Sequence, residues 1–125
     1  MTENEIAKEI VDAAYKIHVQ TGPGLLESAY EAMLVYELRK RGLKVSHQVS
    51  LPVIYEQVQL DIGYRVDLIV EEKVFIELKS VEKVIPVHKK QLLTYLRLAD
   101  KRLGLLINFG AARIKDGISR VVNRL

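Results

Sequence analysis

Two neighbouring apolar segments of this chain carry charge, and this limits what the chain can fold into. Residues 63–70 read Gly-Tyr-Arg-Val-Asp-Leu-Ile-Val and residues 74–79 read Val-Phe-Ile-Glu-Leu-Lys, with a short charged turn between them. Both segments are typical of buried β-strands. Burying a carboxylate is costly unless it is paired, hydrogen-bonded or bound to a metal ion. Asp67, Glu77 and Lys79 are therefore the first candidates for a functional site.

The length of the turn decides whether the two carboxylates meet. A three-residue turn over 71–73 pairs Val70 with Val74 and places Asp67 directly opposite Glu77. A two-residue turn pairs Asp67 with Ile76 and sends the carboxylates to opposite faces of the sheet. A shared site therefore requires a turn of odd length.

Strand alternation predicts which side chains share a face. Glu77 and Lys79 share one face with Phe75. In the preceding strand, we expect one face to carry Arg65, Asp67 and Ile69 and the other to carry Val66, Leu68 and Val70.

Directly opposed carboxylates repel each other unless a cation lies between them, because their Cβ atoms are only about 4.5–5.5 Å apart. Mg²⁺ takes oxygen ligands, usually one or two carboxylates with water and substrate phosphate. It acts as a Lewis acid and lowers the pKa of bound water. Lys79 is then placed to stabilise the attacking hydroxide or the charge that develops on the phosphate. The pattern predicts a magnesium-dependent phosphodiester-cleaving site, and the alternative is a surface hairpin with a solvated polar face.

Length and composition limit the class of protein. At 125 residues, the chain is long enough for one domain, residues 1–125, with a core of its own. It has no cysteine, which excludes disulfides and thiolate metal sites and suits a reducing cytoplasm, the location we expect. The acidic start lacks the basic and apolar regions of a signal peptide. No apolar run reaches the roughly 18 residues of a membrane span.

The charge is unevenly distributed. Residues 1–82 carry 9 Lys and Arg against 14 Asp and Glu, whereas residues 83–125 carry 10 against 2. A basic C-terminal third beside an acidic site suits a nucleic-acid enzyme, and the alternative is an ordinary solvated surface. The candidates for phosphate contacts are Lys89, Lys90, Arg97, Lys101 and Arg102.

Periodicity predicts the order of elements. Helices are expected over residues 4–19, 25–41 and 87–99, and strands over 45–54, 63–70, 74–79 and 102–109. Residues 58–62 either extend the first strand or form a short extra one. Residues 112–123 are expected to form a hairpin that turns at Asp116-Gly117. This order predicts a single α/β domain with a mixed β-sheet flanked by α-helices.

Four blocks of sequence together are similar to a known family. They are Gly24-Leu25-Leu26-Glu27-Ser28-Ala29-Tyr30, then Asp67 with Glu77-Leu78-Lys79, then Gln91-Leu92-Leu93-Thr94-Tyr95-Leu96, and finally Leu105-Leu106-Ile107-Asn108-Phe109-Gly110. In this order and spacing, they cover nearly the whole chain. The chain resembles the GxxExxY proteins of the PD-(D/E)XK nuclease superfamily, which implies a restriction-endonuclease-like fold.

The resemblance also implies roles for residues. Asp67 and Glu77 would bind Mg²⁺, for which Mn²⁺ can substitute, with the Leu78 carbonyl as a further ligand. Lys79 would activate the water. Glu27 would join the metal shell from an early helix, and Gln91 would orient Lys79 or the substrate.

The expected partner is nucleic acid, with DNA preferred to RNA and RNA left open, and no membrane. A homodimer is expected because so small a chain has little surface for wrapping a duplex. The alternative function is a non-catalytic module that keeps the fold and binds nucleic acid or a protein partner.

Several polar residues also have structural interpretations. Tyr30 is expected in the core, with or without its hydroxyl on a site carboxylate. Tyr95 is expected to pack, and Gln91 either faces the cleft or is structural. His18 and His47 are expected to be solvated or hydrogen-bonded, with His88 a weaker site candidate because it precedes Gln91 by one helical turn.

Overall fold

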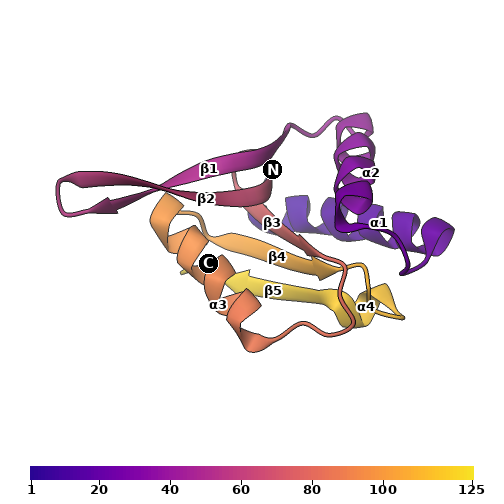
Figure 1. The fold of residues 1–125 in the computed structure, drawn as a ribbon. Coiled ribbons are helices and arrows are strands. Elements are labelled where there is room, and N and C mark those ends of the chain that lie inside the picture. Colours follow the sequence, from indigo (N-terminus) through magenta and orange to yellow (C-terminus); the bar gives the residue numbers. More distant parts are fainter.

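The computed structural model describes residues 1–125 and is built on a five-stranded mixed sheet (Figure 1). Its strands lie side by side in chain order: β1 (Val45–Tyr55), β2 (Val58–Val70), β3 (Val74–Lys79), β4 (Leu103–Asn108) and β5 (Ile118–Val122). Only β3 and β4 are parallel, and the crossover between them contains helix α3 (Pro86–Ala99). The expected α/β domain with a mixed sheet and flanking helices is confirmed.

Helices cover both faces of the sheet. α1 (Glu3–Thr21) and α2 (Glu27–Lys40) lie on one face and α3 lies on the other (Figure 1). α1 begins at Thr2, whose hydroxyl accepts from the Glu5 amide while the Glu5 carboxylate accepts from the Thr2 amide. This reciprocal cap fixes the first turn of α1. No helix is long and apolar enough to cross a membrane.

The sheet separates two apolar clusters. The larger cluster joins α1 and α2 to one face of the strands, through residues that include Ile6, Ile10, Leu34, Leu38, Leu68, Ile76, Leu78 and Ile107. The smaller cluster lies beneath α3 and consists of Leu51, Val66, Phe75, Leu92, Tyr95, Leu96 and Leu106. β3 and β4 are buried on both faces, which explains their continuous apolar sequences.

Two sequence predictions about elements are wrong. Residues 58–62 neither extend β1 nor stand alone, because they form the first half of β2, the strand that carries Asp67. Residues 112–123 do not form a hairpin. Ile114–Gly117 is a short helix, α4, and β5 then pairs with β4. Buried Ile114 belongs to the larger cluster, and this packing favours a helical turn over a hairpin.

The predicted faces of β2 are also wrong at one position. Val66 packs beneath α3, whereas Leu68 and Val70 pack against α1 and α2. The change falls at Asp67, and in β1 the neighbouring Gln48 has a left-handed backbone with φ of 50°. Such a residue interrupts alternation, so the two strands turn their faces over at this point.

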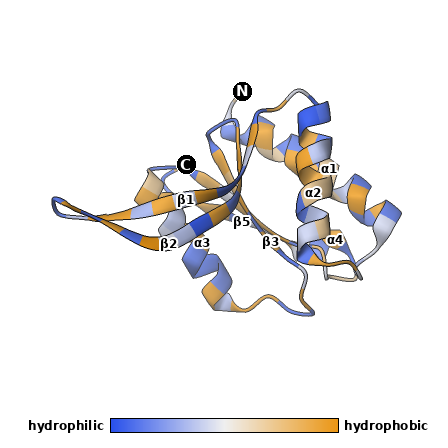
Figure 2. Ribbon diagram, turned by 45° about the horizontal axis from the view of Figure 1, so that its top comes forward, coloured by the Kyte–Doolittle hydropathy of each residue, from blue (hydrophilic) through white to orange (hydrophobic).

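Beyond this point, β1 and β2 form a projecting hairpin, residues 52–64, which we call the arm. It extends away from the rest of the molecule (Figure 1) and has apolar stretches along both strands (Figure 2). The pairing shifts between Leu51 and Val53, where β2 contains Gly63 with φ of 89°. The arm therefore has only its own two strands to hold it together.

Candidate active site

The turn between β2 and β3 has three residues, as a shared carboxylate site requires. Val70 pairs with Val74 and Leu68 with Ile76, so Asp67 comes next to Glu77 in the same register. Glu71 and Glu72 in the turn have left-handed φ values of 54° and 58°. The predicted register is confirmed.

Side chains replace the backbone ladder at this position. The Asp67 amide donates to Oε1 of Glu77 at 2.9 Å, and the Leu78 amide donates to Oδ2 of Asp67 at 2.8 Å. Strand pairing between β2 and β3 ends at Leu68 and Ile76. The two carboxylates therefore lie between the strands at the point where the strands separate.

Glu77 is held in an environment that favours its neutral form. Glu77 is buried, with only 7% of its surface exposed to solvent. Burial, followed by the negative charge of Asp67, raises the pKa of Glu77 from 4.5 to about 8, while the Asp67 amide and Lys79 oppose the shift. A buried carboxylic acid near another carboxylate is a common feature of functional sites.

α2 brings a third carboxylate to the pair. Burial and then the charge of Asp67 raise the pKa of Glu27, and Lys79 acts in the opposite direction. Glu27 therefore lies near both Asp67 and Lys79. Four of the predicted site residues, Glu27, Asp67, Glu77 and Lys79, are brought together by three different elements.

Tyr30 shapes the loop that leads into Glu27. Its hydroxyl donates to the Gly22 carbonyl and accepts from the Leu25 amide, and its ring stacks on Phe109 with centroids 4.4 Å apart. Tyr30 is fully buried, and its hydroxyl does not contact a site carboxylate, so that alternative is wrong. Ser80, directly after Lys79, donates to the Leu25 carbonyl at 2.7 Å and ties the same loop to β3.

Asn108 fixes the segment that follows Lys79 on its other side. Its side chain accepts from the Val81 and Gly110 amides, both at 3.0 Å, and donates to the Val81 carbonyl at 2.9 Å. A side chain at Gly110 would collide with the Val81 backbone. The blocks around Tyr30 and Asn108 therefore serve to position the site strands.

Sequence reasoning missed two residues that extend the cluster. Nε2 of Gln48 donates to Glu31 at 2.7 Å and to Oδ1 of Asp67 at 3.2 Å. Glu31 lies one helical turn beyond Glu27, and this spacing could have identified it. Nothing in the sequence marks Gln48, because its role depends on its left-handed backbone.

On the α3 side, Tyr95 approaches the carboxylates. Burial and then the charge of Glu77 raise the pKa of Tyr95. The centroids of the Tyr95 and Tyr64 rings are 6.0 Å apart. Gln91, one turn earlier, is exposed and makes no hydrogen bond to a site residue. Its proposed role stays a prediction.

None of the histidines forms a hydrogen bond to a carboxylate of the cluster. Nδ1 of His88 accepts from the Ile85 amide at the start of α3, and Nε2 of His18 lies 2.9 Å from the Ala111 carbonyl. His47 is exposed on β1. The weaker candidate His88 therefore has a capping role.

The donor set suits a hard dication. It consists of carboxylate oxygens, and burial, followed by the charge of Asp67, raises the pKa of two of the acids, Glu27 and Glu77. A cation reverses this shift, because it favours the ionised form. No three acidic or histidine side chains converge into a coordination shell, because the carboxylates of Asp67 and Glu77 are turned to backbone amides. Metal binding at this site therefore requires side-chain rotation.

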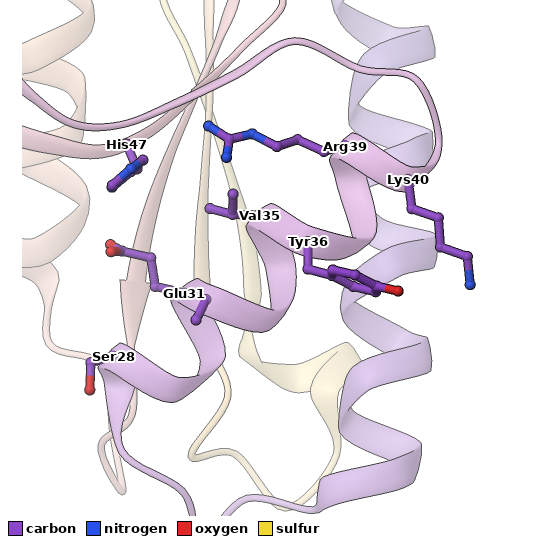
Figure 3. Close-up of a pocket in the computed structure, with 8 residues that line it drawn as sticks. Ser28, Glu31, Val35, Tyr36, Arg39, Lys40 and His47 are labelled. Atoms are coloured by element: carbon purple, nitrogen blue, oxygen red, sulfur yellow. The ribbon is translucent and has the colours of Figure 1, made fainter.

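A groove of about 720 Å³ lies beside the cluster, between α2 and β1 (Figure 3). Glu31 and His47 point toward each other across it, and the guanidinium of Arg39 points toward β1 (Figure 3). Glu31 also contacts Gln48, so the groove begins next to Asp67. The groove is lined by Ser28, Glu31, Ala32, Val35, Tyr36, Arg39, Lys40 and His47.

One of the comparisons with known proteins identifies a family. Neither the curated proteins nor the solved structures include a match to the chain. The sequence profile of the PD-(D/E)XK nuclease superfamily matches residues 4–121, which cover the elements from α1 to β5 except one residue at each end and include all the residues of the site. The chain belongs to the PD-(D/E)XK nuclease superfamily.

Proposed function

We propose that this protein is a magnesium-dependent nuclease that hydrolyses phosphodiester bonds in DNA. The observation that carries the proposal is the register of β2 against β3, which sets Asp67 opposite buried Glu77 where the strands separate. Lys79 follows two residues later on the same strand and its charge acts on Glu77. Two carboxylates can hold a magnesium ion, and a lysine can stabilise the charge that develops on a phosphoryl group.

Within its superfamily, we propose that the chain is a GxxExxY protein. The support is local. Gly24 lies in the loop held by Tyr30, and Glu27 begins α2 directly after that loop. In this arrangement, the three residues of the motif act together to present Glu27 to Asp67.

In the proposed reaction, a water oxygen forms a bond to phosphorus, and the phosphorus–oxygen bond to one sugar breaks. Asp67, Glu77 and Glu27, with the Leu78 carbonyl, would hold Mg²⁺ or Mn²⁺, which supplies Lewis acidity when bound. Nζ of Lys79 orients the water and stabilises the negative charge that grows on the phosphate oxygens. Gln91 orients Lys79 or the substrate.

Two basic surfaces are proposed to hold the DNA. One is the groove beside Glu31, where Arg39, Lys40 and His47 can contact phosphates. The other is the exposed face of α3, which carries Lys89, Lys90 and Arg97 and no acidic residue. Both contribute electrostatic affinity that does not depend on base sequence.

A second candidate function is a non-catalytic module that binds nucleic acid or a protein partner. One observation favours it: both carboxylate oxygens of Asp67 already accept hydrogen bonds, from Leu78 and from Gln48. In this reading, Asp67 is a structural residue that closes the gap between the strands. The two functions differ in whether Lys79 is needed for chemistry.

The test is a cleavage panel with Mg²⁺ or Mn²⁺ over single-stranded, duplex, flapped and branched DNA and over RNA. We expect cleavage of at least one DNA substrate by the wild-type protein and by Lys8→Ala, an exposed lysine on α1 that serves as control. Glu77→Ala and Lys79→Ala should both lose cleavage. Calorimetry should show weaker metal binding in Glu77→Ala and unchanged metal binding in Lys79→Ala.

Each other outcome has a definite meaning. Wild-type-like cleavage by highly purified Lys79→Ala would exclude the proposed site. Binding of DNA without cleavage of any substrate would support the non-catalytic module. Cleavage of RNA alone would retain the site and change the substrate.

A further inference from the structure

The arm has one face that is apolar and open to solvent. Pairing of Tyr55 with Val58 and of Val53 with Leu60 puts these four side chains on one face of the two-stranded ribbon. Closer to the body, beyond the shift in pairing at Gly63, Leu51 pairs with Tyr64, and Leu51 belongs to the cluster beneath α3. Tyr55 is 67% exposed, Val58 55%, Leu60 39% and Tyr64 42%.

A bare two-stranded hairpin is marginally stable in water and needs a hydrophobic partner surface. Neither side of the arm is covered by another strand, because β2 pairs with β3 only from Leu68 to Val70. The arm therefore exposes both its edges and its apolar face. These features indicate that another molecule covers it.

The charges on the arm point to a protein partner. The only charged residues of the arm are Glu56 and Asp61. The arm is therefore acidic, which disfavours binding of nucleic acid or an anionic membrane. Glu56 lies in the turn, and Gln59 pairs with Ile54 on the face opposite Leu60. No charge lies on the apolar face, so two copies of this face can meet without burying one.

The available area suits a weak, reversible dimer. With roughly 200 Å² for each large side chain and the exposed fractions above, the face offers about 400 Å² per protomer. Two such faces bury about 800 Å², which is the size of weak, transient interfaces. A two-fold axis lets one self-complementary face serve both protomers.

We propose that the chain forms a homodimer in which the apolar faces of two arms pack against each other. The dimer does not depend on the nuclease activity, because it is detected by the mass of the particle and not by cleavage of DNA. It has one consequence for the site: the arm ends three residues before Asp67 in β2, and Tyr64 at its base contacts Tyr95. The partner's arm would therefore lie next to the carboxylate cluster.

The test compares two neighbouring substitutions that add the same charge to opposite faces of β2. Leu60→Glu places a carboxylate on the face formed by Val53, Tyr55 and Val58, and Gln59→Glu places it on the opposite face, beside Ile54. Sedimentation equilibrium should give twice the 14.3 kDa chain mass for the wild type and for Gln59→Glu. For Leu60→Glu, the dimer Kd should rise by at least about a hundredfold, because each dimer would bury two unpaired charges.

Circular dichroism establishes that both variants are folded, and amide exchange gives a second measurement. In the wild type, exchange of residues 53–60 should slow as protein concentration rises, and in Leu60→Glu it should not change with concentration. A wild type that stays monomeric at high concentration would overturn the proposal, as would equal dissociation of both variants or of neither. A monomer whose arm tyrosines are quenched by single-stranded DNA would assign the arm to nucleic acid instead.

Discussion

At the scale of single residues, Glu77 makes the stability of the metal-free protein depend on pH. The unfolded chain releases this proton near pH 4.5, whereas the folded protein keeps it until about pH 8. Between these values, the folded state binds more protons, so its stability falls as pH rises and levels off on either side. Each pKa unit corresponds to about 1.4 kcal/mol.

Glu77→Gln should remove this dependence. The amide oxygen can still accept from the Asp67 amide, and the side chain never ionises. We expect urea unfolding without metal to give equal stabilities for variant and wild type near pH 4, and a more stable variant above pH 8. Asp12→Asn on the surface of α1 should keep the wild-type slope. A wild-type protein whose stability rises from pH 5 to 8 would contradict the environment described for Glu77.

Tyr30→Phe tests the loop that presents Glu27. The variant loses the hydrogen bond to the Gly22 carbonyl and the acceptor for the Leu25 amide but keeps the ring on Phe109. We expect a loss of about 1 kcal/mol in unfolding free energy, with weaker metal binding because Glu27 is less well fixed. Tyr15→Phe on α1 is the matched control. Unchanged stability would show that the hydroxyl contacts do not hold the loop.

At the scale of elements, the β2–β3 turn stores strain. Glu72 has a left-handed backbone with φ of 58°, and its ion pair with Lys44 is exposed to solvent. Glycine adopts this conformation without penalty, and exposed pairs contribute little. A left-handed residue other than glycine costs about 1–2 kcal/mol, and glycine loses about 0.4–1 kcal/mol through the entropy of the unfolded chain. Glu72→Gly should therefore stabilise the protein by about 0.5–1 kcal/mol, measured by urea unfolding. Lys73→Gly, at a position without left-handed φ, should not stabilise it.

Part of the fold could be predicted from the sequence, and the β2–β3 turn is one example. Helical periods located α1, α2 and α3, because each helix buries one face. Continuous apolar runs located β3 and β4, because these strands are buried on both faces. The charged turn limited the register of Asp67 against Glu77 to two choices. Local patterns could not assign residues 58–62 to β2, since that depends on where β1 turns back. They also could not place Val66, because the change of face comes from Gln48.

Some residues of the candidate site could likewise be predicted from the sequence, and others could not. The acidic and basic residues in apolar strands, Asp67, Glu77 and Lys79, stand out because their burial needs compensation. Glu27 followed only from the resemblance. Tyr95 was expected to pack, and it does pack, yet it also lies near Glu77. A residue with both roles shows only the packing role in its sequence pattern.

At the scale of the whole molecule, charge is divided between an acidic N-terminal part and a basic C-terminal third. Lys89→Glu with Lys90→Glu should weaken DNA binding and reduce its dependence on salt. Each lost phosphate contact lowers the slope of log K against log salt by about 0.9 for duplex DNA. Fluorescence anisotropy over a salt series measures the slope. A double variant of Lys8 and Lys73 to Glu should keep it, and an unchanged slope in the α3 variant would move the DNA surface elsewhere.

The hydrogen bonds that close the gap between β2 and β3 also make two amides into reporters of the site. The amides of Asp67 and Leu78 are protected by carboxylates, whereas their neighbours are protected by the backbone ladder. A cation that draws these carboxylates to itself leaves the two amides open to solvent. Deuterium uptake at Asp67 and Leu78 should then increase with Mg²⁺, while uptake at Leu68 and Ile76 stays constant. Deuterium uptake at these two amides therefore reports whether a metal ion is bound, and it can be measured without any substrate.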